Sequence, residues 1–149
     1  MRCVILRLIA AAAAVLQTLS SSIVAEGVGV DGLRVALHAQ AIPSKDKVVG
    51  SVLTTDGIRA ALQRRSDVAL VKIFYPFQYR GFMQEAWDLI LIEGWFPMIH
   101  EFIHIARTSS PEALVIFYCL DPIYPGLTQI QGFDVDGYLT NSAELVPLL

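Results

Sequence analysis

Two histidines and a glutamate in the segment His100-Glu101-Phe102-Ile103-His104 have the spacing of a zinc-binding helix. Residues four positions apart on a helix lie on the same face, so the two imidazoles would point in one direction. The pattern H-E-x-x-H uses this geometry to hold Zn²⁺ with two histidines, while the glutamate acts as a general base. His100, Glu101 and His104 are therefore the first candidates for catalysis in this chain.

This short motif resembles that of the zinc metallopeptidases called zincins. A catalytic zinc needs a third protein ligand, yet no His-x-x-Gly-x-x-His continuation follows His104, and Glu112 and Glu144 are the only later glutamates. The chain instead passes through Ser109-Ser110-Pro111 into an apolar run, which favours a helix that connects two strands. We keep a zinc peptidase as an alternative and expect both histidines on an exposed helix face without a third ligand.

A second acidic motif, Asp134-Val135-Asp136-Gly137, lies near the end of the sequence. It resembles the first motif of the haloacid dehalogenase-like phosphatases, in which one aspartate attacks phosphorus and the other transfers a proton beside magnesium. In that family the motif lies on the first strand, and a lysine and further acidic motifs follow it. Only seven residues follow Ser142 here, so we expect a surface turn that enters a short strand.

Short apolar runs alternate with longer amphipathic segments, and this alternation predicts βα units around a parallel sheet. The apolar runs have the composition of strands that are buried on both faces. They are Leu33–Leu37, Val68–Phe74, Leu89–Ile92 and Ala113–Cys119, with Gly137–Leu139 as a shorter fifth candidate. The fold class predicted is α/β, a three-layer Rossmann-like domain with a mostly parallel sheet of about five strands. Positions expected on adjacent parallel strands are Val35, Val71, Ile90 and Val115.

Two segments have the apolar spacing of helices that pack on such a sheet. Ser51–Arg65 is the first, with Val52, Ile58, Ala61 and Leu62 on one stripe and Arg59, Arg64 and Arg65 on the solvent side. Met98–Arg107 is the second, with Ile99, Phe102, Ile103 and Ala106 on its apolar stripe. The stretch Tyr75–Trp87 has no clear period, so we assign it no element.

Polar and aromatic side chains follow four of the predicted strands, and parallel sheets bind ligands at the carboxyl ends of their strands. These segments are Tyr75–Arg80, Glu93–Pro97, Asp121–Gly126 and Thr140–Ser142. Aromatic rings can stack on the C–H face of a sugar, while carboxylates and amides bind its hydroxyl groups. The pattern therefore favours a carbohydrate site, with ordinary turns whose aromatic residues close the core as the alternative.

Composition and charge exclude several classes of protein. The chain has 149 residues, 54% of them hydrophobic, which fits one folded domain and excludes disorder. Its net charge of -3 and the absence of a basic block argue against a nucleic-acid partner. Cys3 and Cys119 are the only cysteines, too few for a disulfide scaffold or a cysteine-rich zinc site.

The first 25 residues contain no acidic residue and have the order of a targeting leader. Arg2 and Arg7 precede an apolar run, and the polar segment Gln17–Ser22 follows it. This order is typical of a secretory signal peptide, here with cleavage after Ala25, whereas a membrane span needs about 20 uninterrupted apolar residues. We expect residues 26–149 to be a secreted or secretory-pathway domain without a transmembrane span, with an organelle transit peptide or a short signal anchor as the alternatives.

Four segments together suggest a relationship that extends from about Leu33 to Leu149. They are Leu33–Phe74, Trp87–Gly94, Phe117–Asp121 and Asp134–Glu144, the last similar to a D-x-hydrophobic-x-T-x-S-x-x-L step. This layout resembles the N-terminal half of a two-domain glycosyltransferase of the GT-B fold, in particular the CgeB-type spore-protein branch. The first loop, His38–Ser44, lacks the Gly-Gly that is often found there in that family.

The resemblance implies transfer of a sugar from a nucleotide donor to an acceptor above the strand ends. Glu93, Trp95, Asp121, Tyr124 and Asn141 are expected to line this cleft, with Asp121 as the catalytic candidate that orients a hydroxyl group. The family holds its nucleotide-sugar mainly with a C-terminal domain. We therefore expect no cofactor here, a carbohydrate or glycosylated acceptor as partner, and no transfer by this half alone. A non-catalytic carbohydrate-binding or structural domain is the remaining alternative.

Overall fold

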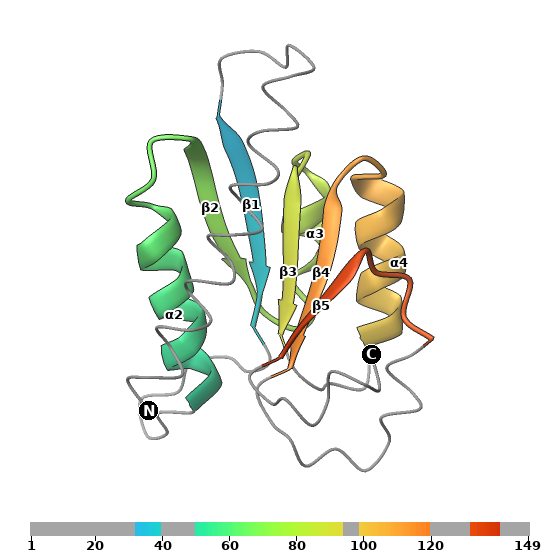
Figure 1. Cartoon of the computed structure of the whole chain (residues 1–149). Helices are drawn as coiled ribbons and strands as arrows, with labels where there is room; N and C mark the ends of the chain where they lie inside the picture. The colour runs from blue at the N-terminus through green and yellow to red at the C-terminus, as the bar shows by residue number, and fades with distance from the viewer. Residues whose placement is uncertain (1–31, 40–49, 94–98, 120–131, 141–149) are drawn as a thin grey trace.

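A computed structural model gives the fold of residues 32–39, 50–93, 99–119 and 132–140 (Figure 1). The elements in chain order are β1 Leu33–His38, α2 Gly50–Leu62, β2 Val68–Phe74, α3 Tyr79–Met83, β3 Leu89–Glu93, α4 Ile99–Ser109, β4 Leu114–Cys119 and β5 Gly137–Thr140. Within these ranges, no helix is long and apolar enough to cross a membrane. The predicted leader lies outside the described residues.

The five strands form one sheet in the order β2-β1-β3-β4-β5, and every neighbouring pair is parallel. Val35 pairs with Val71 on one side of β1, and Ala36 pairs with Ile90 on the other side. Ile90 in turn pairs with Val115 of β4. The predicted adjacency of the four apolar strands and the predicted α/β class are therefore confirmed.

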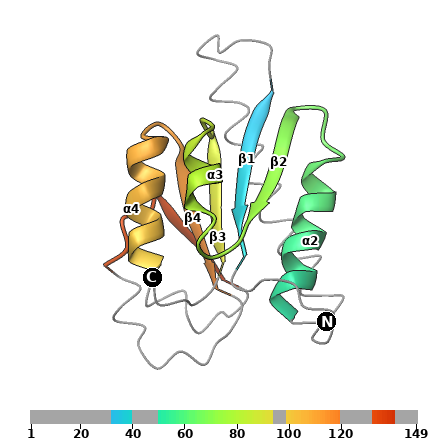
Figure 2. The same cartoon turned by 180° about the vertical axis from the view of Figure 1, so that it is seen from behind.

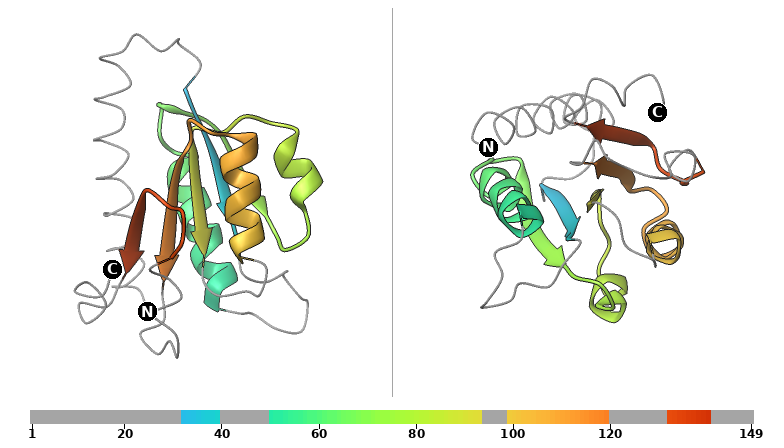
Figure 3. Two further views of the ribbon diagram at one scale, coloured as in Figure 1. Left: turned by 90° about the vertical axis from the view of Figure 1, so that its right-hand side faces the viewer. Right: turned by 90° about the horizontal axis from the view of Figure 1, so that it is seen from below.

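Helices cover both faces of the sheet, which gives the predicted three-layer, Rossmann-like arrangement (Figures 2 and 3). Helix α2 packs on one face, where Ile58 and Leu62 join Val35 and Leu37 in one apolar cluster. Helices α3 and α4 pack on the other face. The second cluster there combines Ala36, Ile90, Ile92, Val115 and Phe117 of the sheet with Phe82, Phe102, Ile103 and Ala106 of the helices. Successive side chains of a strand point to opposite faces, and this alternation supplies both clusters.

The two predicted helices form with small changes at their ends. Helix α4 buries all four residues of its predicted stripe. Helix α2 ends at Leu62, three residues before the predicted end, and Arg65 lies beyond it in a bidentate pair with Asp67. Arg59 and Arg64 are exposed, as predicted. The arginines thus mark the solvent side of α2 and the turn that follows it.

Two features of the β2 region differ from the sequence-based expectations. Strand β2 is not buried on both faces, because it lies at the edge of the sheet and exposes Ala69 and Lys72. An exposed lysine on an edge strand discourages pairing with another chain. The unassigned stretch after β2 forms the short helix α3, whose Phe82 is fully buried against Phe74 and Trp87.

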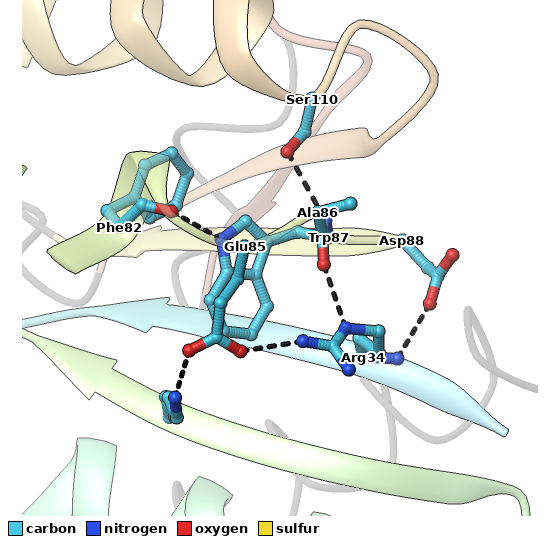
Figure 4. Close-up of polar contacts among 8 residues, drawn as sticks. Arg34, Phe82, Glu85, Ala86, Trp87, Asp88 and Ser110 are labelled. Carbon is cyan, nitrogen blue, oxygen red and sulfur yellow. Dashed lines mark hydrogen bonds and ion pairs between the residues drawn. The ribbon is translucent and has the colours of Figure 1, made fainter. Parts of the chain in front are cut away.

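A polar cluster fixes the connection between α3 and β3 to the amino-terminal end of the sheet (Figure 4). The Glu85 carboxylate lies between two cations of neighbouring strands: Oε2 is 2.6 Å from Nη2 of Arg34, and Oε1 contacts Nζ of Lys72. Arg34 also donates from Nε to the carbonyl of Ala86 at 2.9 Å, and its guanidinium lies 5.8 Å from the centre of the Trp87 ring. One carboxylate therefore joins β1, β2 and the chain that enters β3.

Hydrogen bonds of Trp87 and Asp88 also anchor this connection (Figure 4). Asp88 accepts a hydrogen bond from the backbone N–H of Arg34 at 2.7 Å and donates its own backbone N–H to the Arg34 carbonyl at 2.9 Å. The Trp87 indole donates to the carbonyl of Phe82 at 3.1 Å, and its backbone N–H donates to the hydroxyl of Ser110 at 3.2 Å. The two Arg34–Asp88 bonds set the register of β3 against β1 at this end, while the Trp87 bonds hold the chain that enters β3.

We expect the Glu85→Gln substitution to lower the free energy of unfolding by about 1 kcal/mol, because it removes a charge shared by two cations in a network. Urea denaturation at neutral pH measures the change. Glu112→Gln, in the exposed turn before β4, is the matched control and should stay within about 0.5 kcal/mol of the wild type. Equal losses in the two variants would contradict a specific role for Glu85.

Candidate functional site

The carboxyl ends of β1 and β3 lie next to each other at the point where the chain changes faces of the sheet. From β1 the chain proceeds to α2 on one face, and from β3 it proceeds to α4 on the other (Figure 3). Open parallel sheets bind their ligands at such a switch point. His38 ends β1 and pairs with Ile92, so Glu93 lies one residue beyond it at the end of β3. His38 and Glu93 therefore both lie at the switch point between β1 and β3.

His38 is fully buried and faces α4, where its imidazole lies 4.2 Å from the centre of the Phe102 ring. Burial lowers the pKa of His38 to about 4, although a hydrogen bond with its own backbone acts in the opposite direction. At neutral pH the imidazole is uncharged, so one ring nitrogen can donate a hydrogen bond and the other can accept one. His38 is thus a buried, neutral group whose capacity lies in hydrogen bonding and not in proton transfer near pH 7.

Glu93 is 1% exposed and points toward the opposite face of the sheet, under α2. Its Oε2 accepts a hydrogen bond from the Thr55 hydroxyl at 2.7 Å, and the same hydroxyl lies 3.3 Å from the phenol oxygen of Tyr118. Tyr118 is the register partner of Glu93 on β4. Burial, together with the nearby Glu93 charge, raises the pKa of the Tyr118 phenol well above its ordinary value. We call Thr55, Glu93 and Tyr118 the buried trio.

The buried trio holds a carboxylate in an apolar interior with hydroxyl groups directed at it. An ionised carboxylate in such a place is stable only with hydrogen-bond donors around it. Glu93, predicted to line a sugar cleft, lies at the carboxyl end of β3 but is buried, and its Oε2 accepts a hydrogen bond from Thr55. The other four predicted lining residues, Trp95, Asp121, Tyr124 and Asn141, lie outside the described residues.

Three residues of this region were not singled out from the sequence: His38, Thr55 and Tyr118. Signals for two of them were present. Thr55 lies three and seven positions before Ile58 and Leu62, which puts its hydroxyl on the buried stripe of α2. His38 continues the alternation of β1 by one residue beyond the predicted end. A polar residue that falls on the apolar stripe of a predicted helix, or directly after a predicted buried strand, is therefore the sequence signal for a buried polar group in this fold.

The H-E-x-x-H motif lies on α4, and its His100, Glu101 and His104 are exposed. This confirms the predicted exposed helix face. The His100 ring packs edge-on against Phe133 at 4.7 Å between centres. Across the described residues, no group of three or more histidines, cysteines or acids could hold a metal ion. The described geometry therefore gives no support to the zinc peptidase alternative.

The Asp-x-Asp motif connects β5 to the rest of the domain. Asp136 accepts hydrogen bonds at Oδ2 from Nη1 of Arg107 at 3.0 Å and from the backbone N–H of Val115 at 2.7 Å. Arg107 also donates from Nε to the carbonyl of Asp134 at 3.1 Å. Burial raises the pKa of Asp136, but the hydrogen bonds from Arg107 and Val115 outweigh this effect and the pKa is lowered. The motif is thus a structural turn before β5.

Comparisons of the chain with protein-family models, with curated proteins and with solved structures find no match. A fold alone does not determine function, because one architecture supports many unrelated activities. The assignment must therefore come from the chemistry gathered at the carboxyl ends of the strands, where His38 and the buried trio lie.

The Thr55→Val substitution should lower the free energy of unfolding by about 1–3 kcal/mol, because it keeps the side-chain shape but removes a hydrogen bond to the buried carboxylate. Urea denaturation measures the effect. Thr55→Ser keeps the hydroxyl and loses only a methyl group, so it should be less destabilising than valine. If the valine variant were as stable as the wild type, the Thr55–Glu93 bond would not hold the carboxylate.

The Asp136→Asn substitution should lower the free energy of unfolding at pH 7 by about 1 kcal/mol, since Arg107 loses the nearer of its two anionic partners, which lie at 3.0 Å (Asp136) and 3.6 Å (Asp134). The pKa of Asp136 is lowered in the folded state. Its charge therefore stabilises the fold above about pH 4, and this contribution disappears as the pH falls through the lowered pKa. Urea midpoints at pH 7 and about pH 2.5 should show the difference between wild type and variant shrinking in acid. Asp134→Asn, whose side chain is 79% exposed, should change little at either pH.

Proposed function

We propose that this chain binds a carbohydrate at the carboxyl ends of β1 and β3 and is the acceptor-binding half of an enzyme that transfers sugar from a nucleotide donor. One observation carries the proposal. Of the five buried polar or charged residues in the described ranges, His38, Thr54, Thr55 and Glu93 lie at or next to this edge, and Ser110 lies elsewhere. Such residues reduce stability in an apolar core, so their concentration at a switch point supports a binding role.

The chemistry of these groups suits an acceptor with hydroxyl groups. A sugar hydroxyl both donates and accepts hydrogen bonds, which suits the carboxylate, amide and phenol groups predicted to line the cleft. In the transfer, an acceptor hydroxyl oxygen bonds to the anomeric carbon of the donor while the bond from that carbon to the nucleotide diphosphate breaks. The hydroxyl proton passes to a base, for which Asp121 is our candidate, and Trp95, Tyr124 and Asn141 complete the proposed lining with Glu93.

Saturation-transfer NMR on the purified protein tests the proposal with a panel of free monosaccharides and disaccharides. We expect weak binding of at least one sugar, with a Kd on the order of 1 mM. Asp121→Asn should weaken that binding, whereas Glu112→Gln, in the exposed turn before β4, should not.

Two results would contradict the proposal. Absence of binding by every sugar in the panel would leave a structural role for the domain. Tight binding of a nucleotide-sugar to this chain alone would mean that it is a donor-binding domain or belongs to another class. Metal analysis of the purified protein adds an independent check, since stoichiometric zinc would revive the peptidase alternative built on His100 and His104.

A further inference from the structure

The chain leaves β2 through a tight turn, Tyr75–Gln78, that has an unusual residue at its third position. The backbone N–H of Gln78 donates to the carbonyl of Tyr75 at 3.1 Å, which closes the turn, and Pro76 occupies its second position. Phe77, at the third position, has φ of 71°. Proline second and positive φ third define a type II turn, in which glycine is the usual third residue.

Phe77 is unfavourable for stability in two independent ways. It is the one non-glycine residue with positive φ in the described ranges, and a bulky side chain in that conformation is a strained exception. Its ring is also 75% exposed, more than that of Met83 at 51%, the other exposed large hydrophobic residue. A residue that strains the backbone and adds little to the core points to a role outside folding, since such strain concentrates at functional sites.

The position of Phe77 relates it to the candidate site. The turn follows β2, which pairs with β1, so it lies at the same carboxyl-end edge as His38. Ring centres connect the two: Phe77 to Tyr79 at 6.5 Å, Tyr79 to Phe102 at 5.8 Å, and Phe102 to His38 at 4.2 Å. The turn itself is braced, because the Gln78 side chain accepts a hydrogen bond from the backbone N–H of Tyr75 at 3.2 Å. A continuous row of rings therefore runs from the buried switch point to an exposed, fixed aromatic face.

We propose that Phe77 is a binding residue that stacks on the C–H face of the carbohydrate at this edge. This inference rests on the proposed function, since it assumes that a sugar binds there. The face of a phenyl ring carries partial negative charge, and the axial C–H groups of a sugar ring carry partial positive charge, so the two surfaces attract and exclude water. Phenylalanine offers no hydroxyl group, which leaves hydrogen bonding to the polar groups at the strand ends.

The test compares four variants with the wild type by saturation-transfer NMR, using a sugar that the wild type binds. Phe77→Gly and Phe77→Asn remove the ring but suit positive φ, so both should fold, with a Tm equal to the wild type or a few degrees higher. Both should bind the sugar about tenfold more weakly. Phe77→Trp should restore or tighten binding, because it retains an aromatic face. Met83→Ala is the control for the loss of an exposed hydrophobic side chain, and it should bind as the wild type does.

Each result separates this inference from the proposed function. If the wild type binds a sugar and the glycine and asparagine variants bind it equally well, the stacking role is wrong and the proposed function stands. If the wild type binds no sugar in the panel, both are wrong. A clear fall in Tm for both ring-deleted variants would show that Phe77 supports the fold, and this too would overturn the stacking role.

Discussion

Strand β1 is paired in parallel on both sides, with β2 on one side and β3 on the other. This constraint determines most of the architecture. To return in the same direction beside β1 twice, the chain crosses one face of the sheet through α2 and the other through α3, so three layers result. The carboxyl ends of all the strands then fall on one edge. The change of face between β1 and β3 leaves that edge as the natural place for a ligand.

Polar groups have opposite environments at the amino-terminal and carboxyl-terminal ends of the strands. At the amino-terminal edge, the Arg34–Glu85 pair remains partly in contact with solvent and ties strands together at little desolvation cost. At the carboxyl-terminal edge, Glu93 and His38 are withdrawn from water. Desolvating a carboxylate costs several kcal/mol, whereas a hydrogen bond such as the one from Thr55 returns on the order of 1–3 kcal/mol. Buried polar groups of this kind are therefore weak contributors to stability compared with apolar residues of similar volume.

The sequence predicted the five strands and two long helices because their hydrophobic periods are local properties. It could not show that β2 would be an edge strand, since the order of strands depends on long-range pairing and not on the composition of one run. Helix α3 is a single turn whose position is set by the burial of Phe82, and one turn has no period to detect. The bond between Thr55 and Glu93 joins residues 38 positions apart, and the strained backbone of Phe77 depends on the turn around it. Local patterns contain neither fact.

The all-parallel pairing has a further consequence for the time course of folding. Parallel strands cannot be joined by a tight turn, so no neighbouring pair can form before an intervening crossover has been made. Arg34 and Asp88, which join β1 to β3, are 54 residues apart, and contacts over such separations form slowly. During synthesis on the ribosome, β1 emerges first and stays unpaired along its inner edge until β3 follows. In the nascent chain this unpaired side of β1 is an edge on which another chain could pair.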